Sequence, residues 1–81
     1  MKELLNQLDK LHTTELGVFR IKRNLELDDQ IDPVEYCKMK ISDEKTNITK
    51  TGKNFYATTA KEIITVNVSK LSIITAHKVK N

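Results

Sequence analysis

A chain of 81 residues with 38% apolar and 31% charged side chains has the size and composition of one small globular domain, which excludes a disordered protein. No apolar run approaches the ~20 residues that cross a membrane, and the first residues lack the apolar segment of a signal peptide. The one cysteine, Cys37, excludes an internal disulfide. We therefore expect a cytoplasmic protein without membrane contact.

Two helices are predicted in the first 25 residues, because apolar residues recur there at helical spacing over 2–11 and again over 14–24. Their stripes consist of Met1, Leu4, Leu5, Leu8 and Leu11 in the first and Val18, Ile21 and Leu25 in the second. Thr13 or Thr14 is suited to cap the second helix. Gly17 disfavours that helix by ~1 kcal/mol relative to Ala, unless it permits close packing.

A third helix is predicted over residues 33–41. Asp32 is suited to the N-cap, Pro33 to the first helical position, and Glu35 to a capping box. The buried stripe of this helix would consist of Val34, Cys37 and Ile41. A packed, unreactive thiol is the expected state of Cys37.

Beyond residue 46 the apolar period changes to two. The β-branched and aromatic runs are 47–50, 54–59, 62–68 and 71–78. Connections as short as those between them require antiparallel hairpins. The sequence therefore predicts an α+β fold as a single domain over 1–81, with two or three N-terminal helices packed on one face of a four-stranded antiparallel meander.

Two-residue turns at 52–53, 60–61 and 69–70 would set the register of this meander. The helix-covered face would then collect Ile48, Phe55, Ala57, Ile64, Val66, Val68, Leu71 and Ile73. The open face would collect Asn47, Thr49, Asn54, Tyr56, Thr58, Ile63, Thr65, Asn67, Ser72, Ile74, Ala76 and Lys78. The same count places His77 opposite Glu62, on the helix-covered side.

The charge is distributed unevenly, since residues 1–45 hold eight basic and ten acidic side chains whereas residues 46–81 hold six lysines and one glutamate. This bias favours a nucleic-acid partner, and solubility alone explains it equally well. The candidate nucleic-acid-binding residues are Arg20, Arg23, Lys53, Tyr56, Asn67 and Lys78. Tyr56 would stack on a base and the cations would hold phosphates. Alternatively, the two arginines pair with Glu26 or Asp28.

A histidine beside a carboxylate suits proton transfer in phosphodiester cleavage, so His77 and Glu62 are the candidate catalytic residues. The alternative is a surface pair without chemistry. The sequence has no P-loop, no Rossmann glycine pattern and no Cys/His spacing for zinc, so neither a cofactor nor a metal is expected.

Three stretches carry a resemblance: Leu11–Gly17, Arg20–Leu25, and Gly52–Tyr56 followed by Ile73–Lys78. They resemble an uncharacterised bacterial family of small proteins of unknown function, which implies no activity and no catalytic residues. The order of helices and strands is also similar to that of small ribonuclease toxins of the RelE, colicin and barnase type. The barnase-like set of Glu, Arg and His on the sheet is not clearly present.

Three functions remain open from the sequence. The leading hypothesis is a small nucleic-acid-binding domain, ribonuclease-like and of the toxin type, with RNA as partner. The alternative is a non-catalytic protein-interaction module of phage or mobile-element origin, which would dock a protein partner through an edge strand or the open face. The third is a domain that dimerises through Ile63 and Ile74 on the open face.

Overall fold

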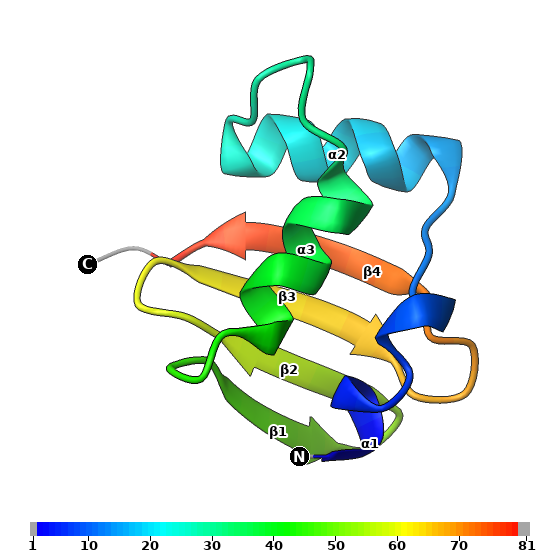
Figure 1. Ribbon diagram of the computed structural model, residues 1–81. Helices are drawn as coiled ribbons and strands as arrows, with labels where there is room; N and C mark the ends of the chain where they lie inside the picture. The colour runs from blue at the N-terminus through cyan, green and yellow to red at the C-terminus, as the bar shows by residue number, and fades with distance from the viewer. Residues whose placement is uncertain (1, 80–81) are drawn as a thin grey trace.

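The computed structural model describes residues 2–79 and places three helices on one face of a four-stranded sheet (Figure 1). The helices are α1 (Lys2–Leu5), α2 (Glu15–Leu25) and α3 (Pro33–Ser42), with a short 3-10 helix, η1 (Leu8–Lys10), after α1. The strands are β1 (Asn47–Thr51), β2 (Asn54–Thr58), β3 (Glu62–Asn67) and β4 (Ile73–Lys78). They pair antiparallel in the order β1-β2-β3-β4, so the predicted α+β meander is confirmed. None of the helices described is long and apolar enough to span a membrane.

The N-terminal segment differs from the single helix predicted over 2–11. It breaks between α1 and η1, and Leu4 and Leu11 are both buried in the core, while Met1 of the predicted stripe lies outside the described residues. After the break the chain becomes extended and His12 pairs in parallel with Ser72. The His12 amide donates to the Leu71 carbonyl (3.2 Å), and the Ile73 amide donates to the His12 carbonyl (2.7 Å). A continuous helix would lose this attachment to the sheet.

Helix α2 begins where the sequence predicts, because Thr14 Oγ1 accepts a hydrogen bond from the Gly17 amide (3.0 Å). Gly17 serves close packing, since a Cβ built there would lie 2.0 Å from Thr13 Oγ1. That hydroxyl donates to the Ile73 carbonyl (3.0 Å) and so ties the start of α2 to β4. The helix then runs along β4 (Figure 1).

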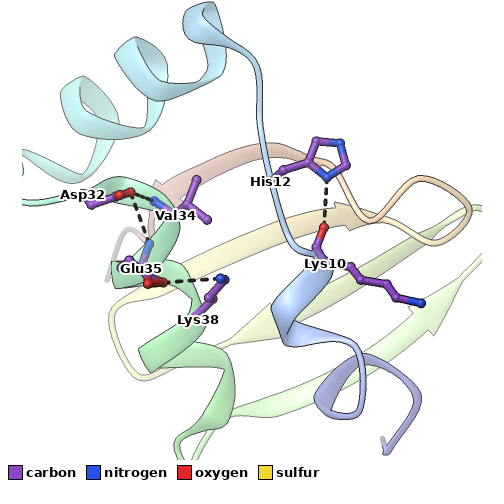
Figure 2. A network of polar contacts seen from close by, with 6 residues as sticks. All are labelled: Lys10, His12, Asp32, Val34, Glu35 and Lys38. Carbon is purple, nitrogen blue, oxygen red and sulfur yellow. Dashed lines mark hydrogen bonds and ion pairs between the residues drawn. The ribbon is translucent and has the colours of Figure 1, made fainter.

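Helix α3 is capped by Asp32, as predicted. Its Oδ1 accepts from the Val34 amide (2.9 Å) and the Glu35 amide (3.4 Å) (Figure 2). The Glu35 carboxylate does not complete a capping box but pairs with Lys38 (3.4 Å). Pro33 occupies the first helical position, where its missing N–H costs nothing.

One core joins the helices to the sheet. Its buried residues are Leu4, Leu11, Ile21, Leu25, Cys37, Ile41, Phe55, Ala57, Ile64, Val66, Leu71, Ile73 and Ala76. The predicted helix-covered face of the sheet is therefore confirmed, with Ile48 and Val68 packed at its margin. Ala76 is an addition, because strict alternation along β4 had placed it on the open face.

A register shift in β4 accounts for this difference. The first two hairpins pair as predicted, with Ile48 opposite Ala57 and Phe55 opposite Val66. Val66 also pairs with Ile73 as predicted, but Thr65 then pairs with Thr75, so that Ile74 is an extra residue. The bulge turns the small Ala76 toward α2, which can then lie close to the strand.

The bulge also overturns the predicted pairing of His77 with Glu62. Glu62 lies opposite Lys78, and His77 lies opposite Ile63. Because side chains alternate along a strand, Glu62 faces the helices and His77 faces away from them. The two candidate catalytic residues are thus on opposite faces of the sheet, and Lys78, predicted on the open face, lies on the helix side.

Candidate functional site

The open face of the sheet is polar and carries no carboxylate. Its cross-strand rows are Asn47, Thr58, Ile63 and His77, then Thr49, Tyr56, Thr65 and Thr75, then Thr51, Asn54 and Asn67. Glu62 is the only acidic residue in the four strands, and it points to the other side. The row geometry places His77 two strands and one row from Tyr56, roughly 12 Å away on the same face.

Three of the predicted nucleic-acid-binding residues come together at one end of this face. Asn67 lies opposite Asn54, whose Nδ2 donates to the Tyr56 hydroxyl (3.4 Å). Lys53 occupies the β1–β2 turn, and its carbonyl accepts from the Val68 amide (2.8 Å), which holds the two neighbouring turns together. The exposed Lys70 is in the second of these turns. Lys53, Tyr56 and Asn67 therefore share one surface.

The remaining predicted cations lie elsewhere. Arg20 and Arg23 are exposed on α2, in the helix layer, and within residues 2–79 neither takes part in an ion pair. Glu26 instead pairs with Lys78, whose hydrogen bond and charge lower the pKa of the Glu26 carboxyl. The predicted pairing of the arginines with Glu26 is thus replaced by an ion pair between α2 and β4.

Glu62 has a partner that sequence reasoning missed. The Tyr36 hydroxyl donates to Glu62 Oε2 at 2.5 Å, and only 6% of the Glu62 surface is exposed. Burial, and then the hydrogen bond to Glu62 and its charge, raise the pKa of Tyr36. Burial, and then the charge of Glu62, raise the pKa of the Cys37 thiol to about 12. A deprotonated Cys37 nucleophile is therefore disfavoured at neutral pH.

This pair lies in a pocket of about 370 Å³ at the opposite end of the sheet from Lys53. The lining residues are Tyr36, Lys40, Asp43, Lys45, Thr46, Thr59, Ala60, Lys61 and Glu62. Of the two residues of this pair, Glu62 was predicted from the sequence as a candidate catalytic residue, and Tyr36 was not singled out. Lys61 belongs to the basic half of the sequence, whereas Lys40 and Lys45 belong to the acidic half, and none of the three lysines was singled out.

The second histidine, His12, lies neither on the open face nor in the pocket. His12 Nδ1 lies 3.0 Å from the Lys10 carbonyl oxygen, which fits the tautomer with the proton on Nδ1 (Figure 2). Its ring is exposed and its backbone pairs with Ser72. His12 therefore belongs to the attachment of the N-terminal segment.

Residues 5–77 match the model of a family described as "Protein of unknown function (DUF3781)". The match includes Tyr36, Tyr56, Glu62 and His77. No curated protein and no solved structure matches the chain. The predicted resemblance to a family of unknown function is confirmed.

Proposed function

Since the chain belongs to the DUF3781 family, whose function is unknown, we propose a function from its own surface: it binds single-stranded nucleic acid on the open face of the sheet. The observation that supports this proposal is the sorting of charge between the two faces. Within the described residues the open face has no carboxylate, and Lys53 and Lys70 lie in the two turns at one of its ends. A polyanion meets no fixed negative charge there.

The side chains of this face suit bases that are not paired in a duplex. Tyr56 is half-buried between Thr49 and Thr65, so its ring is held in place and offers a stacking surface. Asn54 and Asn67 have amide groups that can both donate and accept, as base edges require. Few lysines take part, so affinity should fall only gently with salt, with a slope of about −0.7 per phosphate neutralised.

The proposal is binding without cleavage. Proton transfer by His77 and Glu62 would require both side chains at one phosphodiester, and they lie on opposite faces. His77 instead adds a hydrogen-bonding ring to the open face, in the same row as Asn47 and Thr58. RNA is the expected class of partner, because single-stranded RNA displays unstacked bases.

Fluorescence anisotropy with a labelled single-stranded oligoribonucleotide tests the proposal. We expect binding to the single strand and weaker binding to a duplex. Tyr56→Ala should weaken binding by roughly 5- to 150-fold, from ~1–3 kcal/mol of stacking. Lys10→Ala, which removes an equal charge from the helix side, is the control for Lys53→Ala. No binding, or equal losses in the two lysine variants, would reject the proposal.

A second function, protein interaction, is supported by the outer surface of α2. Leu16 is 59% and Phe19 66% exposed, and Arg20 and Arg23 flank them. A hollow of about 420 Å³ lies beside Phe19. Exposed apolar side chains next to arginines that form no ion pair within residues 2–79 suit an acidic amphipathic segment of a partner protein.

This second function has its own test. Proteins that co-purify with the native chain would be compared with those retained by Phe19→Ser and by the control Ile31→Ser, which removes another exposed apolar side chain. We expect a partner protein that the native chain and the control both retain and that Phe19→Ser does not retain. An acidic segment of that partner should then bind the native chain directly. Equal retention by all three proteins would reject this interface.

A further inference from the structure

The pocket that contains Tyr36 and Glu62 lies on the helix side of the sheet, away from the open face. Four segments line it: α3 through Tyr36 and Lys40, the α3–β1 loop, the β2–β3 turn and the first residue of β3. Its volume of about 370 Å³ falls within the range of small-molecule sites, roughly 300–1,000 Å³. Residues from four separate segments converge on it.

Three lysines from three of these segments line the pocket, namely Lys40, Lys45 and Lys61. None forms an ion pair with another residue of the described chain. Lys40 Nζ lies 5.4 Å from the centroid of the Tyr36 ring, so its ammonium group is held at the pocket. Three like charges around one hollow repel each other, and an anion bound between them would relieve that repulsion.

The two carboxylates of the pocket already accept hydrogen bonds. Asp43 Oδ1 accepts from the Lys45 amide at 2.9 Å, and Glu62 Oε2 accepts from Tyr36 at 2.5 Å. They therefore compete less for the lysine ammonium groups than free carboxylates would. The formal charge of the lining remains positive, with three lysines against two acids.

The backbone that carries the lysines is held by local hydrogen bonds. Thr59 Oγ1 accepts from the Lys61 amide (3.1 Å) and the Glu62 amide (2.9 Å), which fixes the β2–β3 turn. Thr46 Oγ1 donates to the Lys40 carbonyl (2.5 Å) and joins the α3–β1 loop to the end of α3. A pocket built on ordered backbone loses less entropy when a ligand binds.

Glu62 restricts what that ligand can be. Every solvent-shielded side-chain nitrogen and oxygen atom of the described residues has a hydrogen-bond partner, yet no donor within residues 2–79 bonds to Oε1 of Glu62. That oxygen therefore meets solvent, and Glu62 lines the pocket. A carboxylate oxygen repels a bare anion and accepts from an N–H or O–H group. The ligand must present an anionic end to the lysines and a donor to Glu62.

From these contacts we infer that the pocket binds a small phosphate ester that also carries hydroxyl or amino donors. The lysines would hold the phosphate, and Glu62 Oε1 would accept from the donor. Sugar phosphates and nucleoside monophosphates share this chemistry. The site is separate from the open face, so it does not depend on the nucleic-acid proposal.

Titrations followed by amide chemical shifts test the inference, with inorganic phosphate, ribose 5-phosphate and adenosine 5′-monophosphate as probes at constant ionic strength. We expect saturable shifts at Lys40, Thr46, Lys61 and Glu62, larger for the esters than for inorganic phosphate. The ester with the higher affinity shows whether the pocket prefers a sugar phosphate or a nucleotide. Shifts spread evenly over surface lysines, or no shifts, would overturn the inference.

Two variants sharpen the test. Lys61→Ala should weaken ester binding about fivefold, the order expected of one ion pair in water, whereas the control Lys10→Ala, outside both surfaces, should leave it unchanged. Glu62→Gln removes the negative charge and should tighten inorganic phosphate while it weakens the preference for the esters. Equal losses in both lysine variants contradict the site, and Lys61→Ala remains decisive if Glu62→Gln does not fold. Unchanged ester binding by Tyr56→Ala separates this site from the open face.

Discussion

Tyr36 of α3 and Glu62 of β3 are joined by a hydrogen bond of 2.5 Å, which within residues 2–79 is the one side-chain bond between a helix and an inner strand of the sheet. Glu62 is nearly buried, and its charge also acts on Cys37. The pair therefore joins α3 to the sheet, favours the protonated thiol of Cys37 and contributes two lining residues to the pocket.

Removal of the Tyr36 hydroxyl should destabilise the fold. Tyr36→Phe leaves Glu62 Oε2 without its donor, which typically costs about 1–3 kcal/mol for a buried group. Tyr56→Phe is the matched control, because the Tyr56 hydroxyl accepts only a long bond of 3.4 Å from Asn54. Urea denaturation of both variants measures the difference. Equal free energies of unfolding would show that the Tyr36–Glu62 bond does not stabilise the protein.

Stability should fall at alkaline pH. The folded-state pKa of Cys37 is raised from 9.0 to about 12, and that of Tyr36 is raised from 10.0. Both groups keep their protons in the folded state while the unfolded chain ionises, so their contribution is complete below the unfolded pKa and is lost as pH rises through the folded pKa. The free energy of unfolding should therefore decline from about pH 9 upward, first through Cys37.

The double variant Cys37→Ala with Tyr36→Phe should flatten that decline. Urea midpoints between pH 8 and pH 11 would be compared for the native chain and the variant, with each referred to its own value at pH 8. The native chain should lose more stability than the variant over this range. The same slope in both proteins would assign the alkaline loss to other groups.

Cys37 should be unreactive while the protein is folded. The thiol is fully buried and its pKa is raised to about 12, so little thiolate is present and reagents cannot reach it. Ellman's reagent at pH 8 should label the native chain slowly and label the chain in urea at once. Rapid labelling without denaturant would mean that α3 opens easily.

Gly17 should be required for the attachment of α2 to β4. Gly17→Ala forces the Thr13 side chain away, because the new Cβ would lie 2.0 Å from Thr13 Oγ1. Overpacking of this kind costs typically 1–3 kcal/mol and here also breaks the bond from Thr13 to the Ile73 carbonyl. Thr13→Ala removes the clashing hydroxyl, so the double variant should lose less than the sum of the two single losses. Additive losses in thermal denaturation would contradict this packing.

The bulge in β4 can be tested by placing a lysine at each of two neighbouring positions and comparing the stability of the two variants. Ala76→Lys places an ammonium group in the core beneath α2 and should unfold the chain or cost several kcal/mol, because a buried unpaired charge is expensive. His77→Lys, on the open face, should change stability by less than about 0.5 kcal/mol. A strand without the bulge would give the reverse order.

The parts of the fold that follow from local chemistry were predictable from the sequence. Asp32 before Pro33 marks the start of α3, and Gly52 at φ +60° fits the first position of the tight β1–β2 turn. The bulge was not predictable, because counting alternate residues cannot detect one extra residue, and Ala76 is small enough to suit either face. That single shift moved His77 away from Glu62.

Some residues of the candidate sites were likewise predictable from the sequence, and others were not. Lys53, Tyr56 and Asn67 were predicted together because hairpin pairing alone brings them to one face. The positions of Arg20 and Arg23 depend on how α2 packs, which the sequence pattern does not specify. Tyr36 and Glu62 are 26 positions apart and meet only because α3 packs across the sheet, so no local sequence pattern predicts their hydrogen bond.

The backbone pairing of His12 with Ser72 has a consequence for how the sheet ends. An exposed strand edge can recruit a strand from another molecule and seed aggregates. At β4 an intruding strand would have to displace His12 and the Thr13 hydroxyl from Ile73 and so detach the start of α2. At the other edge β1 carries Lys50, a charge that discourages edge-to-edge association. The connection between η1 and α2 thus opposes edge-to-edge association of two molecules at β4.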